Sequence, residues 1–337
     1  MQTLIDPAIL FFVFGALAGL VKSNLEIPPA ISRFLSLYLL MALGLKGGFA
    51  LSQSGLTAEV ATGLALAVSL AVLVPLLSYG LLSRFLSGFD AVAIAATYGS
   101  VSAVTFITAV GHLENQGIAF GGHMAAAMAL MESPAIIMAV LMANALRRQQ
   151  AASPVLLDSS GAGVWVGSAQ PGGAPAFSLG KVLHESFTDG AQLLLLGAMA
   201  VGLLTGESGQ AAMQPFSGDL FKGMLAFFLL DMGLLAARKL PGLKGQSPLL
   251  LAYALLMPLA HALIALGLCR LAGVSQGDTT LLMVLAASAS YIAVPAVVRH
   301  AIPEANPALY VGLSLGLTFP FNILLGIPLY TEIAGWA

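Results

Sequence analysis

Long apolar runs separated by short polar connections make up most of this chain. A helix needs about 20 mostly apolar residues to cross the hydrocarbon core of a bilayer. The sequence therefore predicts ten transmembrane helices, at residues 4–21, 30–50, 58–82, 91–110, 118–145, 186–205, 216–237, 248–270, 279–300 and 306–330. Small and polar residues interrupt the fourth and ninth segments, which predicts that these two helices are broken.

The segment at residues 146–185 departs from this pattern. It begins with Arg147 and Arg148 and continues into a run rich in Ser, Gly, Ala and Pro. Such a composition buries too little apolar surface to fold alone, so we expect a linker. The predicted organisation is a five-helix unit at 1–145, this linker, and a second five-helix unit at 186–337.

The two halves resemble each other at corresponding positions. An offset of 190 residues pairs Ser100 with Ser290. Asp90 and Asp278 each precede an interrupted helix, where we expect them to be N-caps. Further pairs at a similar offset join glycines and prolines, namely Gly44 with Gly233 and Pro134 with Pro320. Because each half has an odd number of spans, the second copy is inverted, and inverted repeats with broken helices are typical of secondary transporters.

Composition supports an all-α integral membrane protein and excludes other classes. Of the 337 residues, 58% are hydrophobic and 8% are charged, whereas soluble domains carry about 25% charged residues. The formal net charge of −2 and the lack of a basic stripe argue against a nucleic-acid partner. The single cysteine, Cys269, excludes a disulfide framework.

The sequence gives little support to an enzyme. It lacks the nucleophile elbow of hydrolases, the zinc-protease motif and the phosphate-binding loop. Gly99-Ser100 superficially resembles the nucleophile of an intramembrane serine protease, but no histidine can be assigned as its base. We therefore expect neither an enzyme nor an organic cofactor.

The basic residues predict the orientation in the membrane. With ten spans and the N-terminus outside, the outer loops hold Lys46, Lys222 and Arg270, and the opposite side holds the other ten of the 13 Lys and Arg. Basic residues concentrate in cytoplasmic loops. We therefore expect both termini outside and the 146–185 linker in the cytoplasm.

Hydroxyl-bearing side chains gather in the middle of the two interrupted segments. Ser100 and Ser102 lie in the fourth and Ser290 lies in the ninth, with Gly99 and Pro295 as the residues at which a helix can break. The N-terminal end of a broken helix exposes N–H groups and a partial positive charge, so it can bind an anion without a buried Lys or Arg. The alternative is that these small residues pack helices together.

Two carboxylates, Glu132 and Asp231, lie inside predicted spans. A carboxylate at that depth is costly and usually faces a cavity. We expect Glu132 to contribute to a sodium site, and Asp231 to fix a helix contact with Lys222 or a hydroxyl group. Asn322 is a neutral polar candidate for the same sodium cavity. The alternative for each is a structural hydrogen bond between helices.

At these same positions the chain closely resembles the sodium-dependent bicarbonate transporter family of the cyanobacterial type. The resemblance covers both halves and most spans. It rests on six motifs: AATYGSVSAVTFITA (95–109), MESPAII (131–137), LHESFTDG (183–190), FFLLDMGL (227–234), ASASYIAVPAVVRHAIPEANPALY (287–310) and TFPFNILLGIPLY (318–330).

The resemblance implies Na⁺/bicarbonate symport across a bacterial inner membrane by an elevator-type homotrimer. For the bicarbonate site it implies Gly99, Ser100, Val101, Ser102, Ala289 and Ser290. For the sodium site it implies Ser100, Ser102, Thr105, Glu132 and Asn322. Members of the family are also inhibited by a PII-like signalling protein at the cytoplasmic face, and such a partner is an open expectation here.

Two other functions remain open from the sequence. A symporter of another small monocarboxylate or oxyanion could use the same fold. A membrane receptor could bind the anion without moving it.

Overall fold

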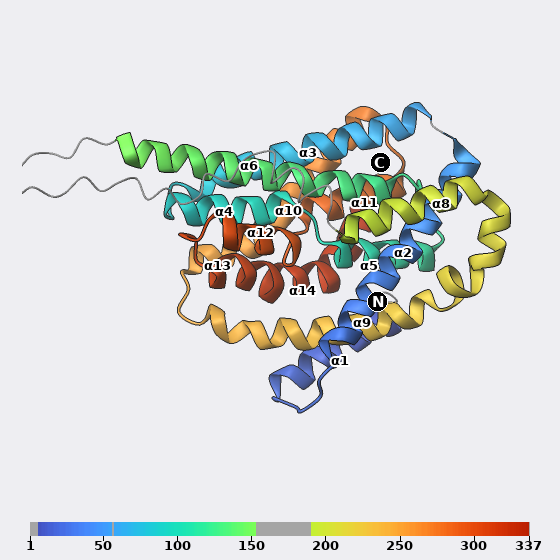
Figure 1. Cartoon of the computed structure of the whole chain (residues 1–337), viewed down its shortest axis with the longest axis horizontal. Helices are drawn as coiled ribbons and strands as arrows, with labels where there is room; N and C mark the ends of the chain where they lie inside the picture. Colours follow the sequence, from blue (N-terminus) through green and yellow to red (C-terminus); the bar gives the residue numbers. More distant parts are fainter. Residues whose placement is uncertain (1–5, 56, 153–189, 337) are drawn as a thin grey trace, which may run out of the picture.

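The structure, a computed structural model, describes residues 6–55, 57–152 and 190–336. Most of the predicted linker lies outside these residues. The described residues form helices and no strands (Figure 1). In chain order the helical segments are α1 (Pro7–Leu20), α2 (Pro29–Ser54), α3 (Ala58–Leu82), α4 (Gly88–Gly99), α5 (Ala103–Gln116), α6 (Met124–Ala152), α8 (Gly190–Met213), η2 (Gln214–Asp219), α9 (Phe221–Lys239), η3 (Leu240–Leu243), α10 (Pro248–Ala272), α11 (Gln276–Ala287), α12 (Ala293–Ala301), α13 (Pro307–Val311), η4 (Gly312–Thr318), α14 (Phe319–Phe321), η5 (Asn322–Gly326) and α15 (Ile327–Ala334).

Seven helical stretches of the described residues are long and apolar enough to cross a membrane. One of them, Gly88–Gln116, joins the two half-helices α4 and α5, and another, Gly190–Leu243, joins α8 and α9. The remaining expected spans correspond to the short apolar helix α1 and to the pair of half-helices α11 and α12. The described residues are therefore all-helical, with enough long apolar helices for a multi-pass membrane protein.

The helices pack into two groups. In the first, which we call the four-helix bundle, α1 packs along α9 and α2 packs along α8. In the second, which we call the broken-helix bundle, α3 packs on α4 and α6, and α10 packs on α11. Helices α5, α12 and the segments from α13 to α15 complete the second bundle (Figure 1).

Glycines allow the close contacts inside the four-helix bundle. A Cβ built on Gly48 of α2 would lie 2.1 Å from the carbonyl oxygen of Met199 in α8. A Cβ on Gly233 of α9 would lie 2.2 Å from the carbonyl oxygen of Phe12 in α1. Both distances are far below van der Waals contact, so only glycine permits these backbones to approach so closely.

Asp231 supports the same bundle. Its carboxylate accepts a hydrogen bond from the hydroxyl of Ser32, which joins α9 to α2. Of the two partners expected from the sequence, the hydroxyl group is confirmed and Lys222 is wrong. Lys222 bonds instead to Asn115.

The two aspartates of the repeat are not N-caps, which corrects the sequence-based expectation. Ser87 occupies the N-cap of α4, where its Oγ accepts a hydrogen bond from the backbone N–H of Asp90 at 3.1 Å. Ser275 occupies the N-cap position of α11, and Asp278 lies in its first turn. An acidic side chain in the first turn still interacts favourably with the helix dipole.

Each aspartate also bonds to a connecting segment. Asp90 accepts a hydrogen bond from the backbone N–H of Asn306 at 2.8 Å, in the connection between α12 and α13. Asp278 accepts one from the backbone N–H of Gly121 at 2.6 Å, in the connection between α5 and α6. The start of each broken helix is thus tied to the segment that follows the other broken helix.

Helix α6 runs past its expected end. It begins at Met124 and ends at Ala152, whereas the sequence predicted a span at 118–145. Arg147 therefore lies on a helix, where it donates to Glu304 and to the carbonyl oxygen of Ala301, each at 2.8 Å. The Arg147 guanidinium holds the pKa of the Glu304 carboxyl below its usual range.

Replacement of Gly48 tests the close contact between α2 and α8. We expect Gly48→Ala to reduce the free energy of unfolding by about 1–3 kcal/mol, because the added methyl group has no space. The control is Gly80→Ala in α3, where no atom lies within 4 Å of the added Cβ. Thermal unfolding in detergent measures both, and equal melting temperatures would contradict the role given to Gly48.

Candidate functional site

The two helix breaks meet in the interior of the broken-helix bundle. Helix α4 ends at Gly99 and α5 begins at Ala103, while α11 ends at Ala287 and α12 begins at Ala293. Figure 1 shows α4 and α12 toward one end of this bundle and α5 and α11 toward the other. The expectation that both segments are interrupted is confirmed.

Backbone hydrogen bonds join the two breaks directly. The N–H of Ser102 donates to the hydroxyl oxygen of Ser288 at 3.0 Å. The N–H of Ser290 donates to the carbonyl oxygen of Thr97 at 2.8 Å. Each break thereby provides acceptors for backbone groups that the other leaves without a helical partner.

The two breaks have different lengths. Helices α4 and α11 both have 12 residues, and both are followed by an extended serine, Ser100 and Ser288 respectively. These serines are 188 residues apart, whereas Ala103 and Ala293, which begin α5 and α12, are 190 apart. The second break is therefore two residues longer: Ser288 follows α11 as Ser100 follows α4, and Ser290, which the sequence paired with Ser100, lies two residues further along the break.

Sequence reasoning missed Ser288 and misplaced the second break. Pro295 was expected at the break but lies in the first turn of α12. A proline is tolerated there, because a first-turn N–H has no acceptor within its own helix. The sequence did contain a signal for the second break: a serine follows each N-terminal half-helix, and these serines, Ser100 and Ser288, are 188 residues apart.

Serine side chains bond to the first turns of the half-helices that leave the breaks, and Ser102 is the N-cap of α5. The Oγ of Ser102 accepts a hydrogen bond from the N–H of Thr105 at 3.2 Å. The Oγ of Ser290 accepts one from the N–H of Val294, also at 3.2 Å. Both hydroxyls keep a proton that they can donate to a ligand.

Gly99 lies where α4 meets α3. A Cβ built on Gly99 would lie 2.5 Å from the Cβ of Pro75, so the end of α4 packs directly on the proline ring. This packing supports a positional role for Gly99 at the end of the half-helix.

A cavity of about 270 Å³ adjoins the breaks, between the two bundles. The beginnings of α5 and α12 line one side, and α2, α6 and α8 line the other. Its polar lining comes from five side chains besides that of Tyr291: Ser36, Ser102, Glu132, Gln192 and Ser290. Among the described residues that line it, Glu132 is the only acid and no base is present.

Glu132 is held at the edge of this cavity. Its Oε2 accepts a hydrogen bond from the side-chain amide of Gln192 at 2.6 Å, which joins α6 to α8. Glu132 thus lines a cavity, and it also makes the hydrogen bond between helices that the sequence left open as the alternative. Gln192 was not identified from the sequence.

The structure divides the predicted site residues into two sets. Val101, Ser102, Glu132 and Ser290 line the cavity. The remaining candidates are not among the described residues that line it, namely Gly99, Ser100, Thr105, Ala289 and Asn322.

Two of these remaining residues carry buried hydroxyls without a hydrogen-bond partner in the described part of the chain. They are Ser100 and Thr105, each 1% exposed. Buried polar groups are nearly always satisfied by protein, water or an ion. The two hydroxyls are therefore the described groups most in need of a ligand near the breaks.

Asn322 has partners on both ends of its amide. The nitrogen donates to the carbonyl oxygen of Ala287, the last residue of α11, at 2.8 Å. The oxygen accepts from the hydroxyl of Tyr330 at 3.0 Å. Asn322 thus fixes the end of α11 at the second break.

Residues 7–335 match the family model described as the Na⁺-dependent bicarbonate transporter superfamily. The match includes both helix breaks and every helix named above. No curated protein sequence matches the chain.

Removal of the Ser288 hydroxyl tests the connection between the breaks. We expect Ser288→Ala to reduce the free energy of unfolding by about 1–3 kcal/mol, because the buried N–H of Ser102 loses its acceptor. The control is Ser69→Ala in α3. The Ser69 hydroxyl is exposed and donates only to the carbonyl oxygen of Ala65 in its own helix. A melting temperature equal to that of the control would contradict this connection.

Proposed function

Because the chain belongs to the Na⁺-dependent bicarbonate transporter superfamily, we propose that it takes up bicarbonate by symport with Na⁺ and binds the anion between its two helix breaks. The family gives Na⁺-dependent bicarbonate transport in general, in a multi-pass membrane protein. It is a family of transporters, so the chain is not an enzyme. The observation that carries the finer proposal is the cavity in which the first turns of α5 and α12 meet.

The anion site proposed here uses helix ends and hydroxyls. The first N–H groups of α5 and α12 have no acceptor within their own helices, and each helix start carries about half a positive charge. Ser102 and Ser290 add hydroxyl donors beside them. A small planar anion with three oxygens can accept several of these bonds at once. Gly99, Ser100, Val101 and Ala289 shape the breaks around the site.

Glu132 gives a reason for coupling to a cation. A carboxylate that lines the same cavity repels an anion, and in an environment of low polarity this repulsion is strong. A sodium ion bound beside Glu132 would cancel the repulsion. The anion and Na⁺ would then each raise the affinity for the other, which is the thermodynamic basis of symport.

The sodium ligands we propose are oxygens around the first break. The unpartnered hydroxyls of Ser100 and Thr105 support this position, and Na⁺ sites of transporters combine such oxygens with the free carbonyls of broken helices. Ser102 and Glu132 lie on the cavity side of the same break. Asn322 contributes by fixing the end of α11.

The membrane potential also favours the transport of one Na⁺ with each bicarbonate. Movement of one negative charge into an inside-negative cell costs about 2.3 kcal/mol per 100 mV. One Na⁺ for each bicarbonate removes this cost. The sodium gradient then supplies the driving force for uptake.

Matched contacts support ten spans in two inverted five-helix repeats. The packing of α1 on α9 corresponds to that of α8 on α2 under exchange of the halves. The bond from Asn306 to Asp90 likewise corresponds to that from Gly121 to Asp278. In this proposal both termini are outside, and the linker at 146–185 is cytoplasmic.

We propose an elevator mechanism on this fold. The four-helix bundle, which includes α2 and α9, remains fixed in a homotrimer, and the broken-helix bundle carries the anion across the membrane. In the proposed orientation the 270 Å³ cavity lies on the cytoplasmic half, beside the start of α8. A PII-like regulator would act from that side, at a linker outside the described residues.

Uptake by proteoliposomes tests the anion site. We expect Ser102→Ala to reduce the ratio kcat/KM for bicarbonate about 10- to 100-fold in a sodium gradient, because it removes a hydrogen bond to a charged ligand. Labelled bicarbonate measures the flux, and Ser69→Ala is the control. Normal uptake by a folded Ser102→Ala protein would contradict the site.

The same assay separates the alternatives. Competition of uptake by another monocarboxylate or oxyanion, at lower concentration than bicarbonate, would favour the symporter of a different anion. Binding of bicarbonate with no sodium-dependent flux would favour a receptor.

Thr105 tests the sodium site separately. We expect Thr105→Val to raise the Na⁺ concentration for half-maximal uptake about tenfold, because one oxygen ligand is replaced by a methyl group of similar size. Thr205→Val is the matched control, since the Thr205 hydroxyl is exposed and bonds only to its own helix. An unchanged sodium dependence would exclude Thr105 as a ligand.

A further inference from the structure

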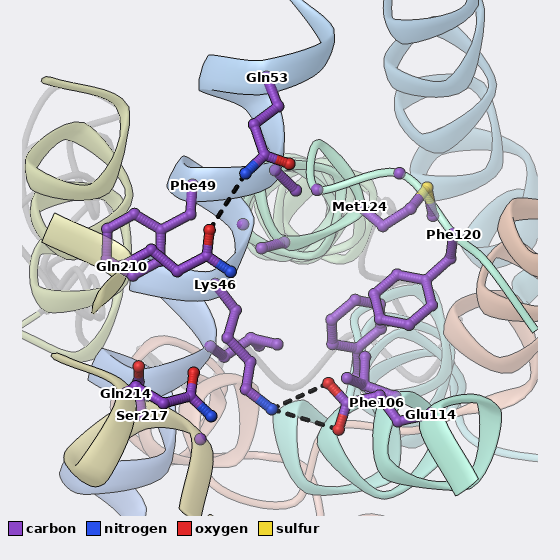
Figure 2. Close-up of a pocket in the computed structure, with 18 of the residues that line it drawn as sticks. Lys46, Phe49, Gln53, Phe106, Glu114, Phe120, Met124, Gln210, Gln214 and Ser217 are labelled. Carbon is purple, nitrogen blue, oxygen red and sulfur yellow. Dashed lines mark hydrogen bonds and ion pairs between the residues drawn. The ribbon is translucent and has the colours of Figure 1, made fainter. Parts of the chain in front are cut away.

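A second and larger cavity of about 580 Å³ lies between the two bundles, at the other end of their interface. Figure 2 shows Lys46 pointing across it toward Glu114, with Gln53, Gln210 and Gln214 around the rim. Helix α2 and the turn between α8 and α9 form one wall, and α5 forms the opposite wall.

Lys46 and Glu114 form an ion pair across this cavity. The Nζ of Lys46 donates to both carboxylate oxygens of Glu114, at 2.8 and 3.2 Å (Figure 2). The side chains are 25% and 28% exposed, so the pair is only partly open to water. The Nζ also lies 3.9 Å from the centre of the Phe221 ring in α9. Lys46 is therefore well positioned in the four-helix bundle, while its anionic partner belongs to the other bundle.

The neighbouring residue Asn115 doubles this connection. Its side-chain oxygen accepts a hydrogen bond from Lys222 of α9. Its side-chain nitrogen donates to the carboxylate of Asp6, the N-cap of α1, at 2.6 Å. The last turn of α5 is thus bonded to α2, to α9 and to the start of α1. These bonds run between the bundles rather than within either.

An apolar layer separates this cavity from the candidate site. Leu43 and Phe106 line the larger cavity, whereas Leu40 and Val104, about one turn or less away on the same helices, line the smaller one. All four side chains are buried. The two cavities therefore lie at opposite ends of one interface, and these four side chains, which belong to one hydrophobic core cluster, lie between them.

We propose that Lys46 and Glu114, supported by Asn115, form a latch between the two bundles that holds this conformation and opens during each transport cycle. The inference rests on the proposed function, because relative movement of the bundles is what requires the latch to open. It deepens that function by naming residues outside the anion and sodium sites that set the conformational equilibrium. An ion pair that is only partly screened is strong enough to bias such an equilibrium and weak enough to break.

Cysteine alkylation in the full chain, without bicarbonate, tests the latch. Val110→Cys places a reporter on α5 that is buried against the larger cavity, and Ala296→Cys places one on α12 in the smaller cavity. Cys269 is fully buried, so the parent chain supplies the background rate. In both Lys46→Gln and Glu114→Gln, we expect alkylation of the first reporter to rise about threefold to fivefold relative to the second.

Two controls make the result specific to the latch. Gln53→Ala removes a bond between Gln53 and Gln210 at the rim of the same cavity, but within the four-helix bundle, and should leave both rates unchanged. A double variant that carries both Lys46→Glu and Glu114→Lys exchanges the two charges and should restore the alkylation rates of the parent chain. Melting temperatures confirm that each variant is folded.

Unchanged alkylation in both neutral variants would overturn the proposal, as would an equal change in Gln53→Ala. Because this readout uses no bicarbonate, it is independent of the uptake assay. If the parent chain showed no uptake but the latch variants showed shifted alkylation, the proposed function would be rejected and the movement of the bundles would be retained. If the parent chain showed normal uptake but the latch variants showed unchanged alkylation, only the latch would be rejected.

Discussion

The constraint on which the rest of this structure depends is that two helices end inside the membrane. Each break removes carbonyl and N–H groups from a helix at a depth where water is scarce, and every such group needs a partner. Serine side chains supply several of these partners. Ser102 and Ser290 accept bonds from first-turn N–H groups of the outgoing half-helices, while the Ser288 hydroxyl and the Thr97 carbonyl accept bonds from the opposite break. The hydroxyls of Ser100 and Thr105, close to the first break, remain without a partner in the described part of the chain, so in the proposed function the cost of breaking the helices and the binding of ions have one origin.

The sequence predicted the features that depend on local chemistry. Hydropathy located the third span at 58–82, which coincides with α3, and clustered hydroxyls located both breaks to within a few residues. Glu132 was identified because a carboxylate is rarely tolerated within a span without a cavity. Each of these signals is contained in a short stretch of chain.

Features that depend on contacts between distant residues could not be predicted in the same way. The partner of Ser102 is Ser288, and the partner of Glu132 is Gln192. Neither pairing follows from spacing, because each joins helices that only the tertiary structure brings together. The N-cap positions were missed for a different reason: Ser87 and Asp90 form one cap in which either residue fits the sequence pattern, and only the backbone angles show which residue precedes the helix.

The unequal lengths of the two breaks have a consequence for recognition. The first has three residues, 100–102, and the second has five, 288–292. A duplicated fold would by itself present two equivalent surfaces to its cargo. With two additional residues on one side, the approach from one half of the protein differs from the approach from the other. In the proposed function, the anion therefore meets a longer stretch of non-helical backbone from the second half of the chain than from the first.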